Sequence, residues 1–378
     1  MTTAQESAAT SPASSPASTP PSTSTDHRTG TSGRRIGLLI LLALIIGLGA
    51  AWYLYGPHSR PHVVLITSGD GPYWDPVIAG AEEAAREFDV KLVVDRVKSD
   101  PYVQSDVIQK RAAERGVDGI AISPLNASSQ ANLLADVAGS TTLVTLDSDS
   151  PVTGRLCFVG TDNYAAGREA GENVRAAIPD GGDVILCLGN PEKENTLHRR
   201  QGVIDELLDR DHVPNRTPDG LDKPIKGERY TIVATLVDGS DPARATELAT
   251  TALKDHPNVK CFVGLLGYST PAVLAALETS GKLGGVKLVG FDVDDRTTAA
   301  IDAGHVYATI MQDQRGCGYH AVRILAGQAR GVKGGLPLFQ VHALPYRTIR
   351  KDNLADARGD GPAPPAAPPT TSTAAAGG

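Results

Sequence analysis

The stretch that decides the fold is residues 287–327, KLVGFDVDDRTTAAIDAGHVYATIMQDQRGCGYHAVRILAG. An apolar run ends at Phe291 and Asp292, a helical pattern follows, a second apolar run ends at Gln312, and another helical pattern closes the stretch. Strands that are apolar throughout and alternate with helices are typical of parallel sheets covered on both faces. The stretch therefore predicts two β-α units, one ending in a carboxylate and the next in an amide.

The same alternation extends from residue 62 to about residue 353. A first series of strand-like runs begins with HVVLITS and ends with RLCFVGT, and a second series begins with a helical pattern over residues 164–178. Residues 212–228 form a polar segment with Pro and Gly, which indicates a loop. Two consecutive series of similar length predict an α/β protein with two doubly wound parallel-sheet lobes.

The two ends of the 378-residue chain have a different composition from its middle. Residues 1–33 are mostly Ala, Ser, Thr and Pro, and residues 358–378 are mostly Ala, Pro, Thr and Gly. Segments of this kind bury too little apolar surface to offset the entropy lost on ordering. Both tails are therefore predicted to be disordered.

An uncharged apolar run, IGLLILLALIIGLGAAWYLY, covers residues 36–55. As a helix it is long enough to cross a hydrocarbon core of about 30 Å. Arg34 and Arg35 precede it, which favours a cytoplasmic N-terminus and places residues 56 onward outside the cytoplasm. The prediction is one transmembrane anchor; a signal peptide cleaved near residues 49–51 is the alternative.

Charge, cysteines and motifs exclude several classes of protein. The net charge of −7, with no basic block in the folded part, argues against nucleic acid as a partner. The four cysteines form no CxxC pair and most lie in apolar runs, so we expect buried thiols and no zinc site; Cys187 and Cys261 are the pair to test for a disulfide. Phosphate-loop, nucleophile-elbow and HExxH motifs are absent, and the histidines lack metal-ligand spacing, so we predict no enzyme, no metal and no cofactor.

Polar and aromatic residues follow the predicted strands at the edge where ligands bind in open parallel sheets. Carboxylates accept hydrogen bonds from neighbouring hydroxyls, an Arg fork donates several in one plane, and aromatic faces pack on the C–H faces of a sugar ring. The candidate ligand-binding residues are Tyr73, Trp74, Ser123, Asp147, Asp149, Asn195, Arg199, Tyr268, Asp292 and Gln312.

Several of these residues have a structural alternative. Asp147 and Asp149 could cap the element that follows them, and Asp292 could be the N-cap of the next helix. Tyr73 and Trp74 could belong to the core beneath the first helix of the fold. The convergence of the whole set at one edge favours the binding interpretation.

Three segments carry a family resemblance: FVGTDNYAAGREAG (158–171), NTLHRRQG (195–202) and VGFDVDDRTTAAIDAGHVYATIMQDQ (289–314). Over residues 62 to about 353 the chain resembles the periplasmic sugar-binding proteins of the ribose-binding type, which share their fold with the effector domains of LacI-type repressors. The resemblance implies a type I periplasmic binding protein whose lobes are joined by three crossovers and close on the ligand.

The resemblance also implies lobe boundaries. It places the crossovers near Thr161 and Asp162, near Gln312 and Asp313, and near His342. The N-lobe would then comprise residues 62–161 and 313–341, and the C-lobe residues 162–312 and 342–353.

The family's ligand-binding pattern maps onto this sequence at seven positions. Tyr73 and Trp74 match its paired aromatics, and Ser123 matches its polar residue after the third strand. Asp147 matches the Asp of its TLD segment, and Arg199 matches the Arg of its RxxGF segment, which reads RRQGV here. Asp292 matches the Asp of its GFD segment, and Gln312 matches its Gln after an ATI segment. The sequence departs from the pattern where an Arg often follows the TLD Asp, which is Ser148 here, and where Asn-Asp often stands, which is replaced at residues 266–268. The resemblance therefore implies a sugar or polyol that differs from ribose.

Together these features predict an extracytoplasmic, membrane-tethered solute-binding protein on the outer side of the inner membrane. It would capture a sugar or related polyol and present it to the permease of an ABC importer. The alternative is a ligand sensor that signals through a membrane receptor or kinase. A repressor is excluded because the N-terminus offers a low-complexity tail and an apolar run in place of a DNA-binding domain.

Overall fold

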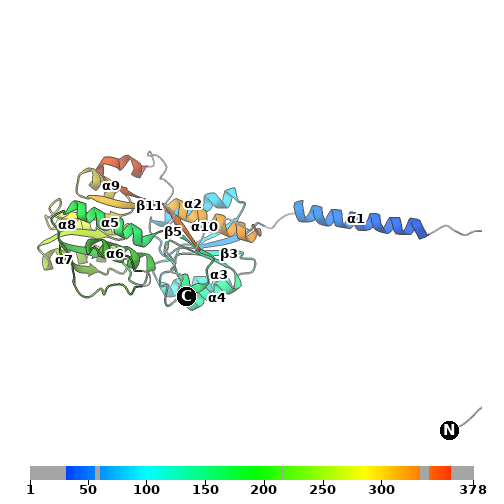
Figure 1. Ribbon diagram of the computed structural model, residues 1–378, viewed down its shortest axis with the longest axis horizontal. Helices are drawn as coiled ribbons and strands as arrows, with labels where there is room; N and C mark the ends of the chain where they lie inside the picture. The colour runs from blue at the N-terminus through cyan, green and yellow to red at the C-terminus, as the bar shows by residue number, and fades with distance from the viewer. Residues whose placement is uncertain (1–30, 56–59, 214–215, 333–339, 359–378) are drawn as a thin grey trace, which may run out of the picture. The chain divides into compact units, whose positions relative to one another are not determined.

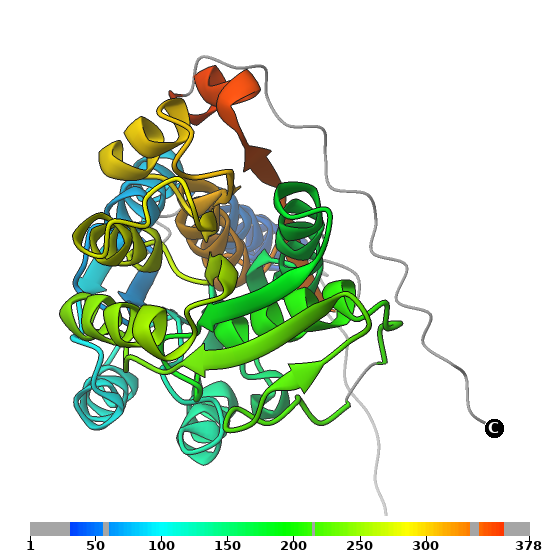
Figure 2. The same ribbon diagram turned by 90° about the vertical axis from the view of Figure 1, so that its left-hand side faces the viewer.

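The computed structural model describes residues 31–55, 60–213, 216–332 and 340–358, and it divides into two units, residues 1–59 and residues 60–378. The described part of the first unit is a helix, α1, Thr31–Tyr55. The second unit contains two lobes, each built on one sheet with helices on both faces (Figures 1 and 2). The alternation of strands and helices in the sequence thus gives the α/β fold that was predicted.

The predicted membrane-spanning helix is not supported. Within the part of the chain that the structure describes, no helix combines the length and the apolar character needed to span a bilayer. The predicted span, residues 36–55, lies within α1, but the side chains of that helix are described only over residues 36–48, where they are exposed. The two predicted disordered tails lie almost entirely outside the described residues.

The first lobe contains a six-stranded, wholly parallel sheet in the order β12-β5-β4-β3-β1-β2. Its strands are buried from end to end except at the edges, as the uniformly apolar runs predicted. Its strands are β1 His62–Ile66, β2 Lys91–Asp95, β3 Gly119–Ile122, β4 Thr142–Leu146, β5 Cys157–Thr161 and β12 Val341–Leu344. Its helices are α2 Trp74–Glu87, α3 Pro101–Ala112, α4 Ala131–Ser140, the short η1 Pro151–Thr153 and α10 Gln314–Ala329.

The second lobe contains a seven-stranded sheet in the order β13-β11-β10-β9-β6-β8-β7. The sequence predicted parallel strands only, whereas the two edge strands, β13 and β7, are antiparallel, and β7 lies inside the predicted polar loop. Its strands are β6 Gly182–Cys187, β7 Ile225–Lys226, β8 Tyr230–Leu236, β9 Val259–Gly264, β10 Lys287–Phe291, β11 Ala308–Gln312 and β13 Tyr346–Ile349. Its helices are α5 Asn163–Ala177, α6 Glu194–Leu207, α7 Pro242–Asp255, α8 Ser269–Thr279, α9 Asp295–Asp302 and the short η3 Lys351–Arg358.

Three connections join the two sheets. Two of them follow β5 and β11, at Asp162 and Asp313, whose carboxylates cap α5 and α10 by accepting from backbone N–H groups. The third lies at Pro345, between β12 of the first sheet and β13 of the second. The sequence placed this crossover near His342; the structure places it later because β12 remains paired with β5 as far as Leu344.

Glycines allow α5 and α6 to pack closely, and this pair positions the candidate site. A Cβ added at Gly202 of α6 would lie 2.3 Å from the carbonyl oxygen of Tyr164 in α5, and one at Gly167 would lie 2.2 Å from that of Arg199. Only glycine permits this approach at both positions. The RRQG segment therefore brings the backbone of Arg199 directly against α5.

All four cysteines are buried and free. Cys187 and Cys261 lie on neighbouring strands, β6 and β9, but Cys261 pairs in register with Val184 and Cys187 pairs with Gly264. The two thiols are therefore offset along the sheet, a poor geometry for a disulfide.

Candidate functional site

Two aspartates occupy matching positions in the two lobes. Asp147 follows β4 and Asp292 follows β10, and both have left-handed backbone conformations, with φ of 62° and 61°. In each case the backbone N–H donates to a carbonyl of the next strand, that of Val159 for Asp147 and that of Ile310 for Asp292. Asp is among the few residues that tolerate this conformation, which turns the chain at the carboxyl end of the strand.

The carboxylate of Asp147 is surrounded by donors. Its Oδ1 accepts from the hydroxyl of Tyr73 at 2.8 Å and from Nδ2 of Asn195 at 3.2 Å. Its Oδ2 accepts from Oγ of Ser123 at 2.9 Å and from Nζ of Lys193 at 3.3 Å. Tyr73 and Ser123 belong to the first lobe, whereas Lys193 and Asn195 come from the second, so this carboxylate joins the lobes across the cleft.

The charges around Asp147 keep it ionised. Burial by itself would raise the pKa of Asp147, but the charges of Lys193 and Arg199 outweigh it, so the pKa lies below its ordinary value. Asp147 is therefore a carboxylate whose partners are all supplied by the protein.

Asp292 has a different environment. Its Oδ1 accepts from Nε2 of Gln312 at 2.9 Å, but its Oδ2 is buried without any hydrogen-bond partner among the described residues. Burial raises the pKa of Asp292 to about 6, against the opposing charge of Arg199 and the nearby side-chain amides of Gln312 and Gln314. A carboxylate oxygen buried in this way is costly unless a donor reaches it.

Arg199 is fixed beside Asp292. Its side chain is 1% exposed and donates from Nε to Oδ1 of Asn163 at 2.9 Å and from Nη1 to the carbonyl of Leu265 at 3.0 Å. Nη2 donates to Oε1 of Gln312 at 2.5 Å, and the guanidinium lies over the ring of Phe291, 4.5 Å from its centroid. The guanidinium carries five N–H donors in a plane, so this arrangement leaves part of the fork available for a ligand.

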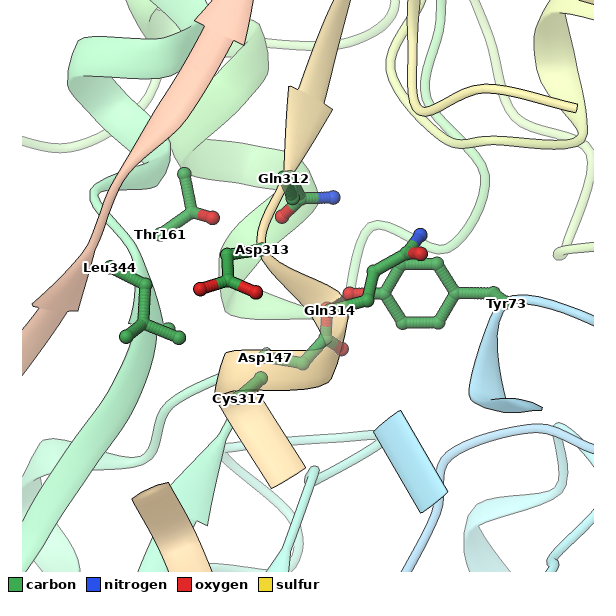
Figure 3. Close-up of a pocket in the computed structure, with 9 residues that line it drawn as sticks. Tyr73, Asp147, Thr161, Gln312, Asp313, Gln314, Cys317 and Leu344 are labelled. Carbon is green, nitrogen blue, oxygen red and sulfur yellow. Dashed lines mark hydrogen bonds between the residues drawn. The ribbon is translucent and has the colours of Figure 1, made fainter. Parts of the chain in front are cut away.

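A small pocket, with a cavity volume of about 10 Å³, lies where the lobes meet, beside all three crossovers. Tyr73 of the first lobe and Gln312 of the second both border it (Figure 3). That volume holds about one water molecule and is far below that of a typical ligand pocket. Side chains thus fill much of the cleft. The residues that line it are Tyr73, Asp147, Gly160, Thr161, Gln312, Asp313, Gln314, Cys317 and Leu344.

Further contacts hold the lobes together along the cleft. Nδ2 of Asn126 donates to Glu192 at 3.1 Å, and Nδ2 of Asn190 donates to the carbonyl of Leu125 at 3.4 Å. These contacts join the loops after β3 and β6. The described conformation is therefore closed.

Seven of the ten predicted residues lie in the two clusters around the aspartates: Tyr73, Ser123, Asp147, Asn195, Arg199, Asp292 and Gln312. Asp292 is not a helix cap, because Asp294 caps α9. Trp74 belongs to the hydrophobic core beneath α2 and α10, as the alternative interpretation had it.

Asp149 and Tyr268 have partners outside these clusters. The carboxylate of Asp149 forms a buried ion pair with Arg155, at 2.5 Å from both Nε and Nη2. The hydroxyl of Tyr268 donates to Asp238 at 2.6 Å, at the end of β8. Ion pairing across six residues leaves no signature in strand periodicity, so the sequence could not separate Asp149 from Asp147.

Lys193 is the one charged residue of the Asp147 cluster that sequence reasoning missed. It precedes α6 in the segment PEKEN, where several charged residues stand together and a solvated loop is the ordinary expectation. The signal that could have found it is its position after β6, on the same sheet edge as the other candidates. Among the described residues, no cluster of three or more His, Cys, Asp or Glu side chains could hold a metal ion.

Fold and site together define a two-lobed α/β binding protein with its ligand site between the lobes. Residues 62–333 match the family model of the periplasmic binding protein domain, and the chain belongs to this family of substrate-binding proteins. The fold is accordingly the type I periplasmic binding protein fold.

Individual relatives are distant. The chain is 23% identical to the D-allose-binding periplasmic protein of Escherichia coli strain K12 over 288 residues, which cover 73% of this chain and 86% of the relative. Among solved structures, an ABC transporter solute-binding protein from Burkholderia graminis in complex with D-arabinose matches with a TM-score of 0.69 and 26% identity, over 79% of this chain and 98% of that one. The XylFII–LytSN complex matches with a TM-score of 0.68 and 23% identity, over 78% and 99% of the two chains, a likeness of fold alone.

Proposed function

We propose that this protein captures a sugar or a related polyol between its lobes, on the extracytoplasmic side of the membrane, and delivers it to an ABC importer. The observation that carries the proposal is Oδ2 of Asp292. It is a buried carboxylate oxygen without a partner among the described residues, and it lies beside Arg199 and Gln312 at the ligand edge of the second sheet. A ligand hydroxyl supplies the donor that this oxygen lacks.

The surrounding groups suit a polyol. The free N–H groups of Arg199 can donate to a hydroxyl oxygen while Asp292 accepts from the same or a neighbouring hydroxyl. Tyr73 is half-buried at the pocket and offers an aromatic ring. Acceptors and donors side by side suit hydroxyl groups, which do both. The D-allose-binding and D-arabinose-bound relatives support the same ligand class.

The experiment is a binding screen with D-allose, D-ribose, D-arabinose and D-galactose. We expect at least one of them to raise the melting temperature and to bind with a measurable heat in calorimetry. The matched control is Asp292→Asn, which keeps the shape of the side chain and should lose the response. The proposal is wrong if no sugar or polyol shifts the melting temperature of the wild-type protein.

A sensor that signals through a membrane receptor or kinase is the second candidate. A protein of the same fold occurs in the XylFII–LytSN complex, so the fold suits either role. Deletion of the gene separates the two roles. Loss of uptake of the radiolabelled sugar supports an importer, whereas normal uptake with a lost transcriptional response to that sugar supports a sensor.

A further inference from the structure

Lys193 is a buried ammonium that reaches from one lobe to the other. It is 7% exposed, and its Nζ lies 2.8 Å from Oγ of Ser68 and 3.3 Å from Oδ2 of Asp147, both in the first lobe. Lysines are almost never buried unless they are paired, because desolvating the ammonium is costly. A lysine in a loop is ordinarily solvated, so the burial of Lys193 in the cleft needs a separate physical reason.

The loop that carries Lys193 is held in place. Oγ1 of Thr196 donates to the carbonyl of Asn190 at 2.7 Å and to that of Lys193 at 3.0 Å, and the N–H of Lys193 donates to the carbonyl of Asn190. These bonds close the turn between β6 and α6. The backbone of Lys193 is thus fixed at the start of α6, and the long side chain spans the cleft.

The acceptor sites of Asp147 are already occupied. A carboxylate has about four lone-pair sites, two on each oxygen. Tyr73 and Asn195 take those of Oδ1, and Ser123 and Lys193 take those of Oδ2. In the closed conformation a ligand hydroxyl cannot donate to Asp147 without displacing one of these donors.

Two unused groups lie next to this filled carboxylate. An ammonium has three donors, and the described contacts of Lys193 use two of them, with Ser68 and Asp147. Oδ1 of Asn195 is buried without a partner in the described part of the chain, and the side chain is 1% exposed. The orientation of this amide is fixed, because only its NH₂ group can donate to the Asp147 carboxylate. One donor of Lys193 and one acceptor of Asn195 are thus unused, on two side chains that bind the same carboxylate.

We propose that Lys193 and Asn195 together recognise one hydroxyl of the ligand, and that Asp147 is a positioning residue that holds them. The hydroxyl oxygen accepts from the ammonium of Lys193, and its hydrogen is donated to Oδ1 of Asn195. This pair makes the site selective for a ligand with a hydroxyl at that position. The inference rests on the proposed function, since it assigns a contact to the same sugar or polyol.

The test is a double-mutant cycle in which one change is made in the protein and the other is the removal of one hydroxyl from the ligand. Calorimetry measures Kd for the sugar that binds best in the screen, and for each of its singly deoxygenated analogues, with wild type and Lys193→Met. A lost charge-assisted hydrogen bond weakens binding about 10–100-fold. We expect this loss for the parent sugar and for all analogues but one. The remaining analogue, which lacks the recognised hydroxyl, should bind both proteins equally.

The control is Lys254→Met, which removes an exposed lysine of the same lobe near the end of α7 and should leave every Kd unchanged. A uniform loss over all analogues would mean that Lys193 only stabilises closure, and it would overturn the inference. So would an unchanged Kd of Lys193→Met for the parent sugar. If wild type binds no sugar or polyol at all, the proposed function itself fails, so the two failures are distinguishable.

Discussion

The two lobes place an aspartate at the end of the equivalent strand, yet the two carboxylates differ in their hydrogen-bond partners and in the direction of their pKa shifts. Asp147 and Asp292 share their backbone conformation and their hydrogen bond to the next strand. Asp147 accepts four hydrogen bonds from the protein, and its pKa is lowered. Asp292 accepts one from Gln312, keeps a buried oxygen without a partner among the described residues, and has a pKa raised to about 6.

The difference indicates that equivalent positions in a pseudo-symmetric fold can take separate roles. A carboxylate whose lone-pair sites all accept from protein donors orients the groups around it. A carboxylate with an unused, buried oxygen can accept a donor from a ligand. By this comparison, Asp292 binds the ligand, and Asp147 makes the hydrogen bonds that connect the two lobes. Changing the two residues one at a time is the direct way to break this assignment.

The largest expected effect follows from Asp292→Ala. Oδ2 has two unused lone-pair sites, so two charge-assisted hydrogen bonds to ligand hydroxyls, of about 1.5–3 kcal/mol each, would be lost, and we expect sugar affinity to fall about 1,000-fold. The fold should remain intact, because a poorly paired buried charge is removed. Calorimetry measures the affinity, and thermal denaturation checks the fold.

The control for this change is Asp295→Ala, which removes an exposed carboxylate at the start of α9. It should bind sugar as wild type does. Equal affinity of Asp292→Ala and wild type would show that Asp292 is a structural residue and would cancel the contrast between the two aspartates.

A smaller effect is expected from Asp147→Asn. Removing this charge leaves Lys193 without its counter-ion in the cleft, but opening of the lobes allows the ammonium to return to water, which limits the cost. We expect an affinity loss of about 30-fold, near 2 kcal/mol, and weaker discrimination against the analogue that lacks the hydroxyl facing Lys193. Small-angle scattering should show a larger radius of gyration for the unliganded variant.

Asp136→Asn, on the exposed face of α4, is the matched control and should leave both measurements unchanged. If Asp147→Asn weakens binding more than Asp292→Ala does, Asp147 is the main anchor of the ligand. The assignment of roles would then be reversed.

The contrast shows what the sequence could and could not predict. Strand periodicity and the rule that ligands bind at the carboxyl ends of parallel strands were enough to select both aspartates and Arg199. They do not predict which carboxylate is filled, because its donors come from separate strands and from both lobes. Lys193 was missed for this reason: its role depends on the reach of its side chain across the cleft, which no local pattern records.

The sequence also did not predict the antiparallel edge strands of the second sheet, for a similar reason. The uniformly apolar strands were predicted, whereas the antiparallel strands β7 and β13 are short and only partly buried. Their pairing is decided by the sheet edge available to them and leaves little periodicity. The third crossover was displaced for the same reason, since the end of β12 depends on its pairing with β5.

The third expected effect is a dependence of sugar affinity on pH, through the ionisation of Asp292. Hydroxyl donors stabilise the ionised form of Asp292, so its pKa is lower in the complex than the value of about 6 in the free protein. Affinity is therefore full above about pH 6 and is lost as the pH falls below it. Between about pH 7.5 and pH 5 we expect Kd to rise about tenfold, with proton release on binding near pH 6. Calorimetry in buffers of different ionisation enthalpy measures both quantities.

The stability of the unliganded protein should move the other way. A carboxyl whose pKa is raised on folding binds its proton more tightly in the folded state, so its contribution stabilises the protein as the pH falls from about 6 towards 4. Asp147, whose pKa is lowered, loses its stabilising contribution only as the pH falls to about 4 and below. The difference in unfolding free energy between wild type and Asp292→Asn isolates the effect of Asp292. A difference that does not depend on pH would contradict the raised pKa.

The smallest expected effect concerns the space beside the free oxygen of Asp292. A Cβ added at Gly267 would lie 3.2 Å from Oδ2 of Asp292, where a bound hydroxyl has to approach. In Gly267→Ala the added methyl group should lower sugar affinity about fivefold, near 1 kcal/mol, with little change in unfolding free energy.

Gly139→Ala in α4, where an added Cβ meets no atom within 4 Å, is the control for the change of residue type and should leave Kd unchanged. No such loss is expected near Asp147, since its oxygens already have partners. If Gly267→Ala binds sugar as wild type does, the ligand does not use Oδ2, and the free oxygen of Asp292 no longer distinguishes the two lobes.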